Sequence, residues 1–582
     1  MRFLLDYLKP YKWRFLWQFL VKVGGTVVEL FLPSMLSIIL DEYAPAGDMQ
    51  HVWLMGGGML LCALLAWLGN VTANKLSTCV SREITRKLRR DLFDKAQSLS
   101  AAQRDKLTES SLVSRLTSDT YNVHQMIDKM QRLGVRAPIL LMGGLIVAAV
   151  LEPVLTLVMA ATLPLLAFTV VKVSRRGVPL FTHVQRAQDG MVRKVQENMT
   201  GARVIRALSR TQWERDRFDE VNEHLAASQR TADMTMALVS PIVNLLLNLG
   251  LAAVVLVGAS RVAAGVSQPG KIIAFLSYFT IILNALLAVS RMFVMYSKGS
   301  ASARRLGEIL NMPADLAVAP APKETRREPH LVFDHVTFSY NKTRPDVQDI
   351  SFSLNQGETL GIIGPTGSGK STLLSLLLRQ YDPDSGEIRL DGRSIVSIPP
   401  EKLREGVGVV FQNDFLMADT LRENIRFGRD ISDEALLSAA DNAQAGFIRQ
   451  KEGVLDFVLN VRGRNLSGGQ QQRVLIARAL AQSPSLLLLD DCSSALDFKT
   501  DLALRHSLRA NHKGATTILV AQRVSAVMAA DHILVMDGGR MVGYGTHEEL
   551  RKACPLYHDT ICANSSWAMN PERRPPYEKQ RL

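Results

Sequence analysis

The sequence predicts a membrane domain built from six long α-helices, followed by a soluble α/β domain. The chain has 582 residues, which is more than a single domain usually contains. Hydrophobic residues make up 47% of it, and its mean hydropathy of +0.07 is high for a soluble protein. The long apolar runs fall in the first half, whereas the second half alternates short strand-like and helix-like segments.

Six apolar stretches are long enough to cross a bilayer, because a helix of about 20 residues spans about 30 Å of hydrocarbon. The third and fourth stretches form one apolar block. We divide this block at Leu151-Glu152-Pro153, since a charge and a proline both disfavour a continuous membrane helix. The predicted spans are residues 15–40, 52–74, 134–152, 154–174, 237–261 and 271–294.

The loops between the spans predict how the chain is oriented. Residues 81–95 and 172–180 are rich in Lys and Arg, whereas residues 41–50 are acidic. Basic loops stay in the cytoplasm, so we expect a multi-pass protein of the cell (inner) membrane with both termini and the soluble domain in the cytoplasm. These loops also explain most of the net charge of +13, and we therefore expect a lipid bilayer and no nucleic acid as a partner.

The predicted domain boundaries follow from these patterns. The loops after the second and fourth spans keep helical periodicity, so we expect them to extend the membrane helices into the cytoplasm. A segment rich in Pro, Ala and charged residues is expected to be a linker. The predicted units are a transmembrane domain at 1–310, the linker at 311–330, the soluble domain at 331–565 and a flexible tail at 566–582.

Two charged residues occur within the first span. Lys22 and Glu29 are seven residues apart, so they lie on one face of the helix. An acid inside the membrane is a functional candidate by default, and Glu29 is our candidate for lining a substrate cavity. The alternatives are a packed ion pair and a lysine side chain that reaches the membrane surface.

A glycine-rich segment in the soluble half has the pattern of a phosphate-binding loop. The strand-like "TLGIIG" precedes it and an apolar, helix-like run follows it, which is the context such a loop requires. The glycines allow backbone N–H groups to face the phosphates of ATP, Lys370 adds positive charge, and Ser371 can ligate Mg²⁺. The predicted ATP-binding residues are Gly364, Pro365, Thr366, Gly367, Ser368, Gly369, Lys370, Ser371 and Thr372.

A second acid-bearing motif supports the same interpretation. The apolar run "LLLLD" predicts a buried strand that ends at Asp490, whose carboxylate can hold Mg²⁺ directly or through water. With the phosphate-binding loop, it predicts ATP and Mg²⁺ as cofactors.

Between these motifs lies a second glycine-bearing turn that opens a helix. Its residues are Leu466, Ser467, Gly468, Gly469 and Gln470. The start of a helix favours anions, yet one chain already has one phosphate-binding loop. We therefore expect this turn to serve an ATP molecule held by another chain.

The motifs in this order resemble the nucleotide-binding domain of ABC transporters. The order is "GPTGSGKST", "VVFQN", "LSGGQ", "LLLLDD", "SSALD" and "LVAQRVS". With six spans before it, the chain over residues 1–560 resembles an ABC exporter half-transporter of the type IV class. The resemblance implies a P-loop (ABC) ATPase domain, ATP hydrolysis coupled to transport, and two ATP molecules held between two such halves.

The resemblance also implies roles for individual residues. Tyr340 would stack on adenine, and Gln412 would contact Mg²⁺. Residues 110–120 and 197–210 would be two helices that couple the membrane domain to the soluble one. The loop that crosses to the opposite ATP would be Ser493, Ser494, Ala495, Leu496 and Asp497.

Two positions in the predicted catalytic site depart from the family pattern. Asp491 stands where the family usually has a glutamate that polarises water, and Gln522 stands where it usually has a histidine. Aspartate is shorter by about 1 Å, and a misplacement of that size can cost about a hundredfold in rate. Glutamine cannot change its charge near neutral pH. We therefore expect a degenerate, slowly hydrolysing ATP site. The alternative is that Asp491 is sufficient for hydrolysis, so that the site is active but slow.

The expected function is that of one subunit of a heterodimeric, multidrug-type exporter. Its "LSGGQ" segment is intact and would complete the ATP site of a partner half-transporter. The expected substrate is an amphiphilic small molecule or a lipid. Alternatives within the same architecture are a lipid floppase, a homodimer with two slow sites, and an ATP-gated channel or regulator. A peptide exporter with a protease domain lacks room before the first span, and six spans exclude a DNA-repair ATPase.

Overall fold

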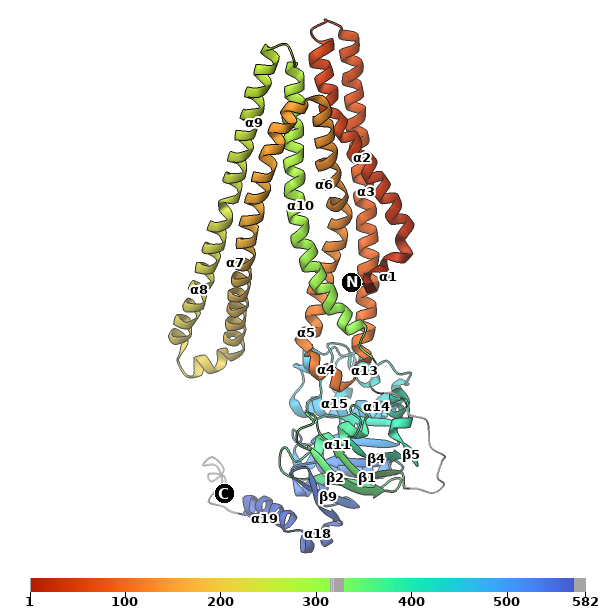
Figure 1. Ribbon diagram of the computed structural model, residues 1–582. Helices are drawn as coiled ribbons and strands as arrows, with labels where there is room; N and C mark the ends of the chain where they lie inside the picture. The colour runs from red at the N-terminus through yellow and green to blue at the C-terminus, as the bar shows by residue number, and fades with distance from the viewer. Residues whose placement is uncertain (1, 314–315, 317, 319–328, 570–582) are drawn as a thin grey trace. The chain divides into compact units, whose positions relative to one another are not determined.

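The computed structural model describes residues 2–313, 316, 318 and 329–569 (Figure 1). The chain divides into two compact units. The first comprises Met1–Ser98 and Glu109–Met312, and the second comprises Leu99–Thr108 and Pro313–Leu582. A short segment from between two membrane helices thus groups with the soluble domain.

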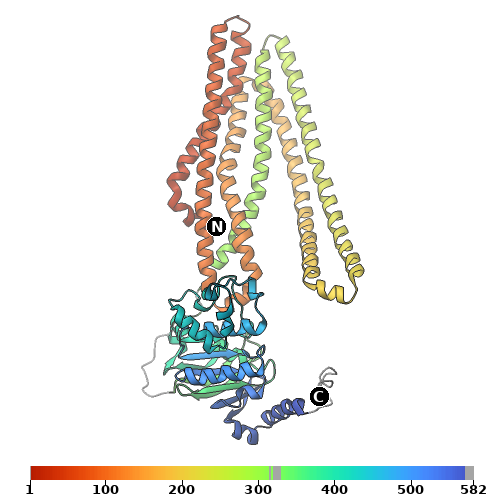
Figure 2. The ribbon, with the colours of Figure 1, turned by 180° about the vertical axis from the view of Figure 1, so that it is seen from behind.

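The first unit consists of helices. The long ones are α2 (Lys12–Ile38), α3 (Met49–Ser98), α6 (Thr120–Leu151), α7 (Pro153–Ala207), α8 (Thr211–Ala237), α9 (Val239–Ala263) and α10 (Pro269–Leu310). Shorter helical segments are α1 (Arg2–Leu8), η1 (Lys9–Tyr11), η2 (Ile39–Tyr43), α5 (Glu109–Ser114) and η3 (Arg115–Asp119). Helices α2, α3, α6 and α10 pack side by side, and α7 pairs with α8 and α9 (Figures 1 and 2).

Each of the six predicted spans lies mostly in one of these long helices, which confirms the helical transmembrane domain; residues 39 and 40 belong to η2, Glu152 lies between α6 and α7, and Ala237 ends α8. Among the described residues, five stretches are both long and apolar enough to cross a membrane, and the apolar start of α7, Pro153–Leu166, is shorter. Glu152 separates α6 from α7 in extended conformation, and the following proline takes the first helical position. Its buried carboxylate lies 3.4 Å from Arg261, which explains how the charge is accommodated.

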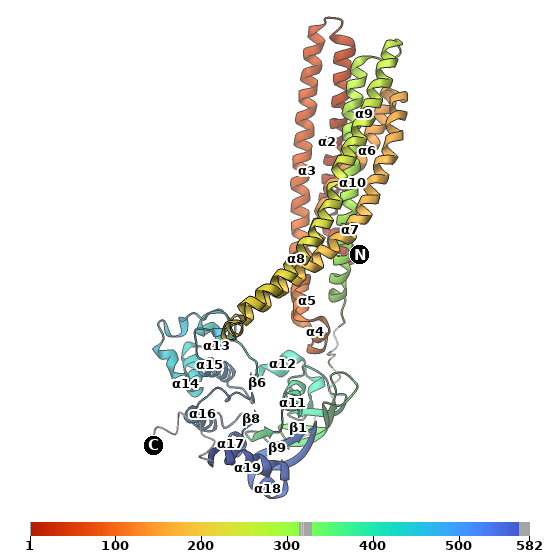
Figure 3. The same cartoon turned by 90° about the vertical axis from the view of Figure 1, so that its left-hand side faces the viewer.

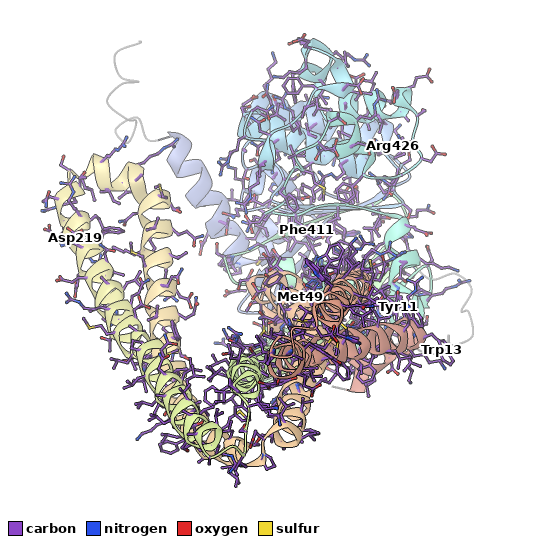
Figure 4. The ribbon with its side chains drawn as sticks, turned by 90° about the horizontal axis from the view of Figure 1, so that it is seen from above. Tyr11, Trp13, Met49, Asp219, Phe411 and Arg426 are labelled. Carbon is purple, nitrogen blue, oxygen red and sulfur yellow. The ribbon has the colours of Figure 1, made fainter. Side chains whose placement is uncertain are left out.

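The outer surface of the membrane helices is apolar. Trp13 is 72% exposed and Trp17 is 63% exposed, and Figure 4 shows Trp13 at the outer side of the N-terminal helices. Exposed tryptophans near the ends of apolar helices are typical of residues that contact the membrane interface.

The second unit contains two β-sheets. The smaller, antiparallel sheet has the order β2-β1-β4-β5, and the larger sheet has the order β10-β9-β3-β8-β7-β6. Strands β9, β3, β8, β7 and β6 are parallel, and β10 is an antiparallel edge. The strands are β1 (Leu331–Phe338), β2 (Val347–Leu354), β3 (Thr359–Ile363), β4 (Ser385–Leu390), β5 (Arg393–Ser394), β6 (Val407–Val410), β7 (Leu486–Asp490), β8 (Thr516–Val520), β9 (His532–Asp537) and β10 (Arg540–Gly545).

The second unit also contains helices (Figure 3). They are α4 (Ala101–Leu107), α11 (Lys370–Leu377), α12 (Pro400–Glu405), α13 (Leu421–Arg426), α14 (Asp433–Asn442), α15 (Gly468–Leu480), α16 (Phe498–Asn511), α17 (Val524–Val527), α18 (His547–Ala553) and α19 (Pro555–Met569). Short 3₁₀ segments are η4 (Ile395–Ser397), η5 (Gly446–Gln450), η6 (Val454–Asp456) and η7 (Val461–Gly463). All five residues of β7 are buried, which fits the predicted buried strand at "LLLLD".

Four predicted segments need comment. The segment that groups with the second unit is Leu99–Thr108, which contains α4, whereas residues 110–120, predicted to form the first coupling helix, lie in α5, η3 and the start of α6. Residues 197–210 form the end of α7 and the turn before α8. Helix α19 continues to Met569, past the predicted start of the tail, and most of the predicted linker and residues 570–582 lie outside the described residues.

Candidate functional site

The topology of the larger sheet brings the predicted nucleotide residues together. Strands β3, β8 and β7 are neighbours and run parallel, so the residues that follow them meet at one edge of the sheet. A pocket lies there. It is lined by Asp346, Thr366, Gly367, Gly369, Lys370, Ser371, Thr372, Gln412, Asp490, Asp491, Val520, Ala521 and Gln522.

The glycine-rich loop between β3 and α11 requires its glycines. Gly367 and Gly369 have φ of 81° and 96°, a region that L side chains rarely adopt. A Cβ atom on Gly369 would lie 2.8 Å from the carbonyl oxygen of Asp346, and one on Gly364 would lie 2.1 Å from that of Met536. The loop therefore adopts a turn that leads directly into the start of α11, where backbone N–H groups favour an anion.

Lys370 lies at the start of α11. Its Nζ donates hydrogen bonds to the carbonyl oxygens of Gly364 and Pro365, at 2.8 and 2.7 Å. Burial lowers the pKa of Lys370, and the carboxylates of Asp490 and Asp491 act in the opposite direction. A triphosphate would supply the negative charge that favours the protonated lysine.

Asp490 and Ser371 provide the oxygen atoms expected of a magnesium site. Asp490 is 5% exposed, and burial raises the pKa of its carboxyl group, while a hydrogen bond with Ser371 opposes the rise. A buried carboxylate next to a hydroxyl group fits Mg²⁺, which prefers oxygen ligands and would offset the charge of the carboxylate. Gln412 also lines the pocket, so its amide oxygen is available there.

The two residues that depart from the family pattern contact each other. Gln522 Nε2 donates a hydrogen bond to Asp491 Oδ2 at 3.2 Å, and both residues line the pocket. Asp491 has a φ of 48°, and its backbone N–H bonds to Val520. Burial raises the pKa of the Asp491 carboxyl group, and Arg523 and Lys370 oppose this. One oxygen of this short carboxylate is thus engaged by an amide.

The other predicted nucleotide contacts lie at or beside the pocket. Tyr340 is 43% exposed, and its hydroxyl group donates to Thr372 Oγ1 at 3.4 Å. Gly364, Pro365 and Ser368 belong to the loop but do not line the pocket within the described part of the chain. Ser368 is 2% exposed, and a Cβ atom on Gly364 would lie 2.9 Å from its Oγ.

The sequence did not lead us to Asp346, which lines the pocket. Its carboxylate accepts the backbone N–H of Tyr340 at 2.9 Å, and its carbonyl oxygen lies against Gly369 and Gly539. The only signal in the sequence was an aspartate after a proline in a polar turn, which is common in loops. Asp346 fixes the segment that carries Tyr340 next to the phosphate-binding loop.

The "LSGGQ" segment forms the start of α15. Ser467 Oγ accepts the backbone N–H of Gln470, and the Gln470 side chain accepts the backbone N–H of Ser467, which together make a capping box. Leu466 is buried, whereas Ser467 and Gly468 are exposed and Gly469 is half-buried. Among the residues that the structure describes, none of these five lines the pocket of its own chain.

The predicted crossing loop lies between Asp491 and α16. Ser494 Oγ donates to the carbonyl oxygen of Asp491 at 3.0 Å, and the Gln472 side chain bonds to Asp491 and to Ala495. Asp497 caps α16 by accepting from the backbone N–H of Thr500 at 2.8 Å. Ser493, Ser494 and Leu496 line a smaller pocket to which Asp491 and Gln522 also contribute. The crossing loop thus ties Asp491 to α15 through Gln472.

In the membrane domain, Glu29 does not pair with Lys22. Arg136 of α6 donates to both oxygens of Glu29, at 2.7 and 3.0 Å, and the side chains of Glu29 and Arg136 are 24% and 39% exposed. Lys22 is 3% exposed and donates to Asn70 and Asn74 of α3. The alternative of a packed ion pair is therefore present, with a different partner from the one considered.

Comparison with known proteins adds two matches to family models. Residues 15–286 match the ABC transporter transmembrane region, and residues 347–494 match the ABC transporter domain. The chain is 34% identical to the ABC transporter ATP-binding protein YfiB of Bacillus subtilis, over 95% of this chain and 96% of that protein. It is 33% identical to the ABC transporter ATP-binding protein Rv1273c of Mycobacterium tuberculosis, over 97% of this chain and 98% of that protein.

A solved structure shares the fold across both units. It is described as a bacterial Atm1-family ABC exporter with ATP bound, and it matches with a TM-score of 0.79 and 23% identity over 96% of this chain and 98% of that chain. The half-transporter fold implies that two such chains associate in a membrane. The chain belongs to the ABC transporter family, as a half-transporter in which a helical transmembrane domain is fused to an ATP-binding domain.

Proposed function

We propose that this chain is the degenerate-site subunit of a heterodimeric ATP-driven exporter, which moves amphiphilic compounds out of the cytoplasm or the inner leaflet. One observation carries the proposal. The pocket of this chain contains the Asp491–Gln522 pair, whereas its "LSGGQ" segment is intact and well capped and, among the described residues, does not line that pocket.

The Asp491–Gln522 pair is suited to holding ATP more than to hydrolysing it. Hydrolysis needs a carboxylate that polarises the attacking water and accepts a proton from it. This carboxylate must therefore lie within hydrogen-bond reach of the water. Asp491 is short, and one of its oxygen atoms already accepts from Gln522. A reacting group that lies about 1 Å too far away can lower the rate about a hundredfold.

The "LSGGQ" segment supplies what a second chain needs. The exposed Ser467 and Gly468 stand at the start of α15, a helix of 13 residues, where free backbone N–H groups and the helix dipole favour a phosphate. Such donors stabilise charge that develops on a transferred phosphoryl group. The ATP that they serve is expected to be bound by the partner's phosphate-binding loop, in the cytoplasm of the cell.

The membrane domain supports an amphiphilic substrate. Its helices present many exposed apolar side chains, and Glu29 with Arg136 places a partly exposed ion pair among them. A molecule with an apolar body and a charged or polar group fits both features. Transport of a labelled lipid or drug into inverted vesicles distinguishes an exporter or floppase from an ATP-gated channel, which would not accumulate the substrate.

Co-purification with a partner tests the heterodimer. We expect a one-to-one complex with a second half-transporter that has Glu and His at the positions matching Asp491 and Gln522, and an altered "LSGGQ" segment. The measurement is the subunit ratio of the complex purified through a tag on this chain alone. A stable, active complex of this chain with itself would contradict the heterodimer and support the homodimer with two slow sites.

Replacement of the lysine in the phosphate-binding loop gives a kinetic test. We expect Lys370→Ala to leave steady-state phosphate release by the complex within about twofold of the unmodified rate, because the faster site uses the partner's loop. The equivalent change in the partner is expected to lower the rate about a hundredfold. Equal losses from the two changes would show two equivalent sites.

A further inference from the structure

Three aromatic rings pack beside the nucleotide pocket. The ring of Tyr340 meets that of Tyr381 edge to face, with centroids 5.1 Å apart at 88°, and it meets Phe338 in the same way at 5.0 Å and 84°. Edge-to-face contacts of this kind are favourable and depend on the orientation of both rings. Tyr340 nevertheless remains 43% exposed, so part of its ring is free to contact a base.

The hydroxyl group of Tyr381 points to a different segment. It donates a hydrogen bond of 2.6 Å to Asp105 Oδ2 in α4, the short helix that groups with the soluble unit. A bond of this length between a hydroxyl group and a carboxylate is charge-assisted and strong. The described contacts of α4 also include the Gln103 side chain on the carbonyl oxygen of Pro313, and Leu107 is buried.

Tyr381 is fixed relative to the phosphate-binding loop. It follows α11, the helix that begins at Lys370, and the chain just before it is held by two arginines. Arg379 is fully buried and donates to Asp382 and to the carbonyl oxygen of Ile398, while Arg404 donates to the carbonyl oxygens of residues 378 and 379. Because the backbone before Tyr381 is held in this way, rotation of its side-chain ring is the main motion open to this residue.

We propose that Tyr381 is a positioning residue that links an adenine ring bound on Tyr340 to α4, with Asp105 as the receiving group. This inference rests on the proposed function, since it requires that ATP binds at Tyr340. A base stacked on Tyr340 restricts the motion of the Tyr340 ring. Because this ring contacts Tyr381 edge to face, the Tyr381 ring is restricted too, and the Tyr381 hydroxyl group is held toward Asp105. Segment 99–108 joins α3 to α5, so its order reaches the membrane helices through the backbone.

The link predicts that the base, and not only the phosphates, orders α4. Amide hydrogen exchange of residues 99–108 in the full-length protein is measured without nucleotide, with a non-hydrolysable ATP analogue and Mg²⁺, and with tripolyphosphate and Mg²⁺. We expect the ATP analogue to slow exchange about fivefold, the lower end of typical coupling between two sites, and tripolyphosphate to leave it unchanged.

Two substitutions test the path. Tyr381→Phe keeps the ring contact and removes the hydroxyl group, and Asp105→Ala removes the acceptor; each is expected to abolish the protection by the analogue while its binding stays within about twofold. The double variant is expected to show no further loss, because both changes remove one bond. Tyr544→Phe is the matched control, since Tyr544 donates its hydroxyl group to the carbonyl oxygen of Ser353 and should keep full protection.

The inference is overturned if Tyr381→Phe keeps the protection of the unmodified protein, or if tripolyphosphate protects residues 99–108 as well as the ATP analogue does. If the analogue raises the unfolding temperature in either case, ATP still binds to the protein, and the proposed function stands although the inference fails. If the analogue fails to raise the unfolding temperature of the unmodified protein, the proposed function fails together with the inference.

Discussion

Gly468→Asp in this chain is expected to lower the ATPase rate of the assembled transporter by about a hundredfold, because it removes stabilisation from the faster ATP site. A Cβ atom on Gly468 would lie 3.9 Å from the nearest atom, the Cβ of Ala495, so the chain has room for a side chain. An aspartate at the start of α15 also suits the dipole of its own helix. The loss is therefore expected to come from repulsion between the new carboxylate and the phosphates of the partner's ATP.

The comparison with Asp491→Asn makes this result informative. Asp491 belongs to the site that we expect to be slow, so its replacement should leave phosphate release within about twofold. Gly514→Asp is a matched control, because the space around Gly514 is also open and it lies away from α15. If Asp491→Asn abolishes hydrolysis as completely as Gly468→Asp does, this chain's own site performs the turnover.

Ser467 is a less suitable target for substitution than Gly468. Its side chain caps α15, so Ser467→Ala would destabilise the helix by about 1 kcal/mol as well as remove a phosphate contact. The two effects would then be mixed in one measurement. Gly468 separates them, since it takes no part in the capping box.

Arg379→Ala is expected to destabilise the ATP-binding unit by about 3 kcal/mol, the lower end of the range for breaking a buried ion pair, because Arg379 is buried whereas the Asp382 side chain is 32% exposed. Arg379 is fully buried, and its guanidinium bonds to Asp382 at 2.9 Å and to the carbonyl oxygen of Ile398 at 3.0 Å. Removal leaves a cavity and unpaired polar groups. The apparent unfolding temperature should fall by on the order of 10 °C.

Thermal unfolding of the full-length protein, followed by fluorescence, measures this effect. Arg379→Lys keeps the charge but loses the planar fork of donors, so we expect an intermediate temperature. Arg551→Ala, on the exposed side of α18, is a control that should change the temperature little. An Arg379→Ala protein as stable as this control would mean that the buried guanidinium contributes no net stability.

The nucleotide pocket illustrates what the sequence could predict. The loop at 364–372 and the acid at Asp490 were identifiable because each pattern is local: glycines at fixed spacing, or an apolar run that ends in a carboxylate. Asp346 was not identifiable, because its place at the pocket depends on contacts with Gly369 and Gly539, which are far from it in the sequence. The hydrogen bond between Gln522 and Asp491 was missed for the same reason.

The breaks between α3, α4 and α5 were not predicted for a different reason. Helix α3 ends at Ser98 and α4 ends at Leu107, but no glycine or proline marks either break. Thr108 makes the second break in a conformation with a φ of 56°, which a threonine rarely adopts. The sequence pattern therefore predicts continuous helix across the positions where the structure separates α3, α4 and α5.

The strand order of the larger sheet has a consequence for how the protein is made. Strand β3, which carries the phosphate-binding loop, pairs with β8 on one edge and β9 on the other, and residues 364–515 lie between β3 and the first of these two strands in the sequence. During synthesis, β3 leaves the ribosome long before either neighbour exists, and it must wait with both of its edges unpaired. Contacts between such distant segments form slowly, and exposed strand edges favour aggregation. The nucleotide pocket can thus close only when almost the whole chain has been translated, so a chain truncated before β8 would be a substrate for chaperones and proteases.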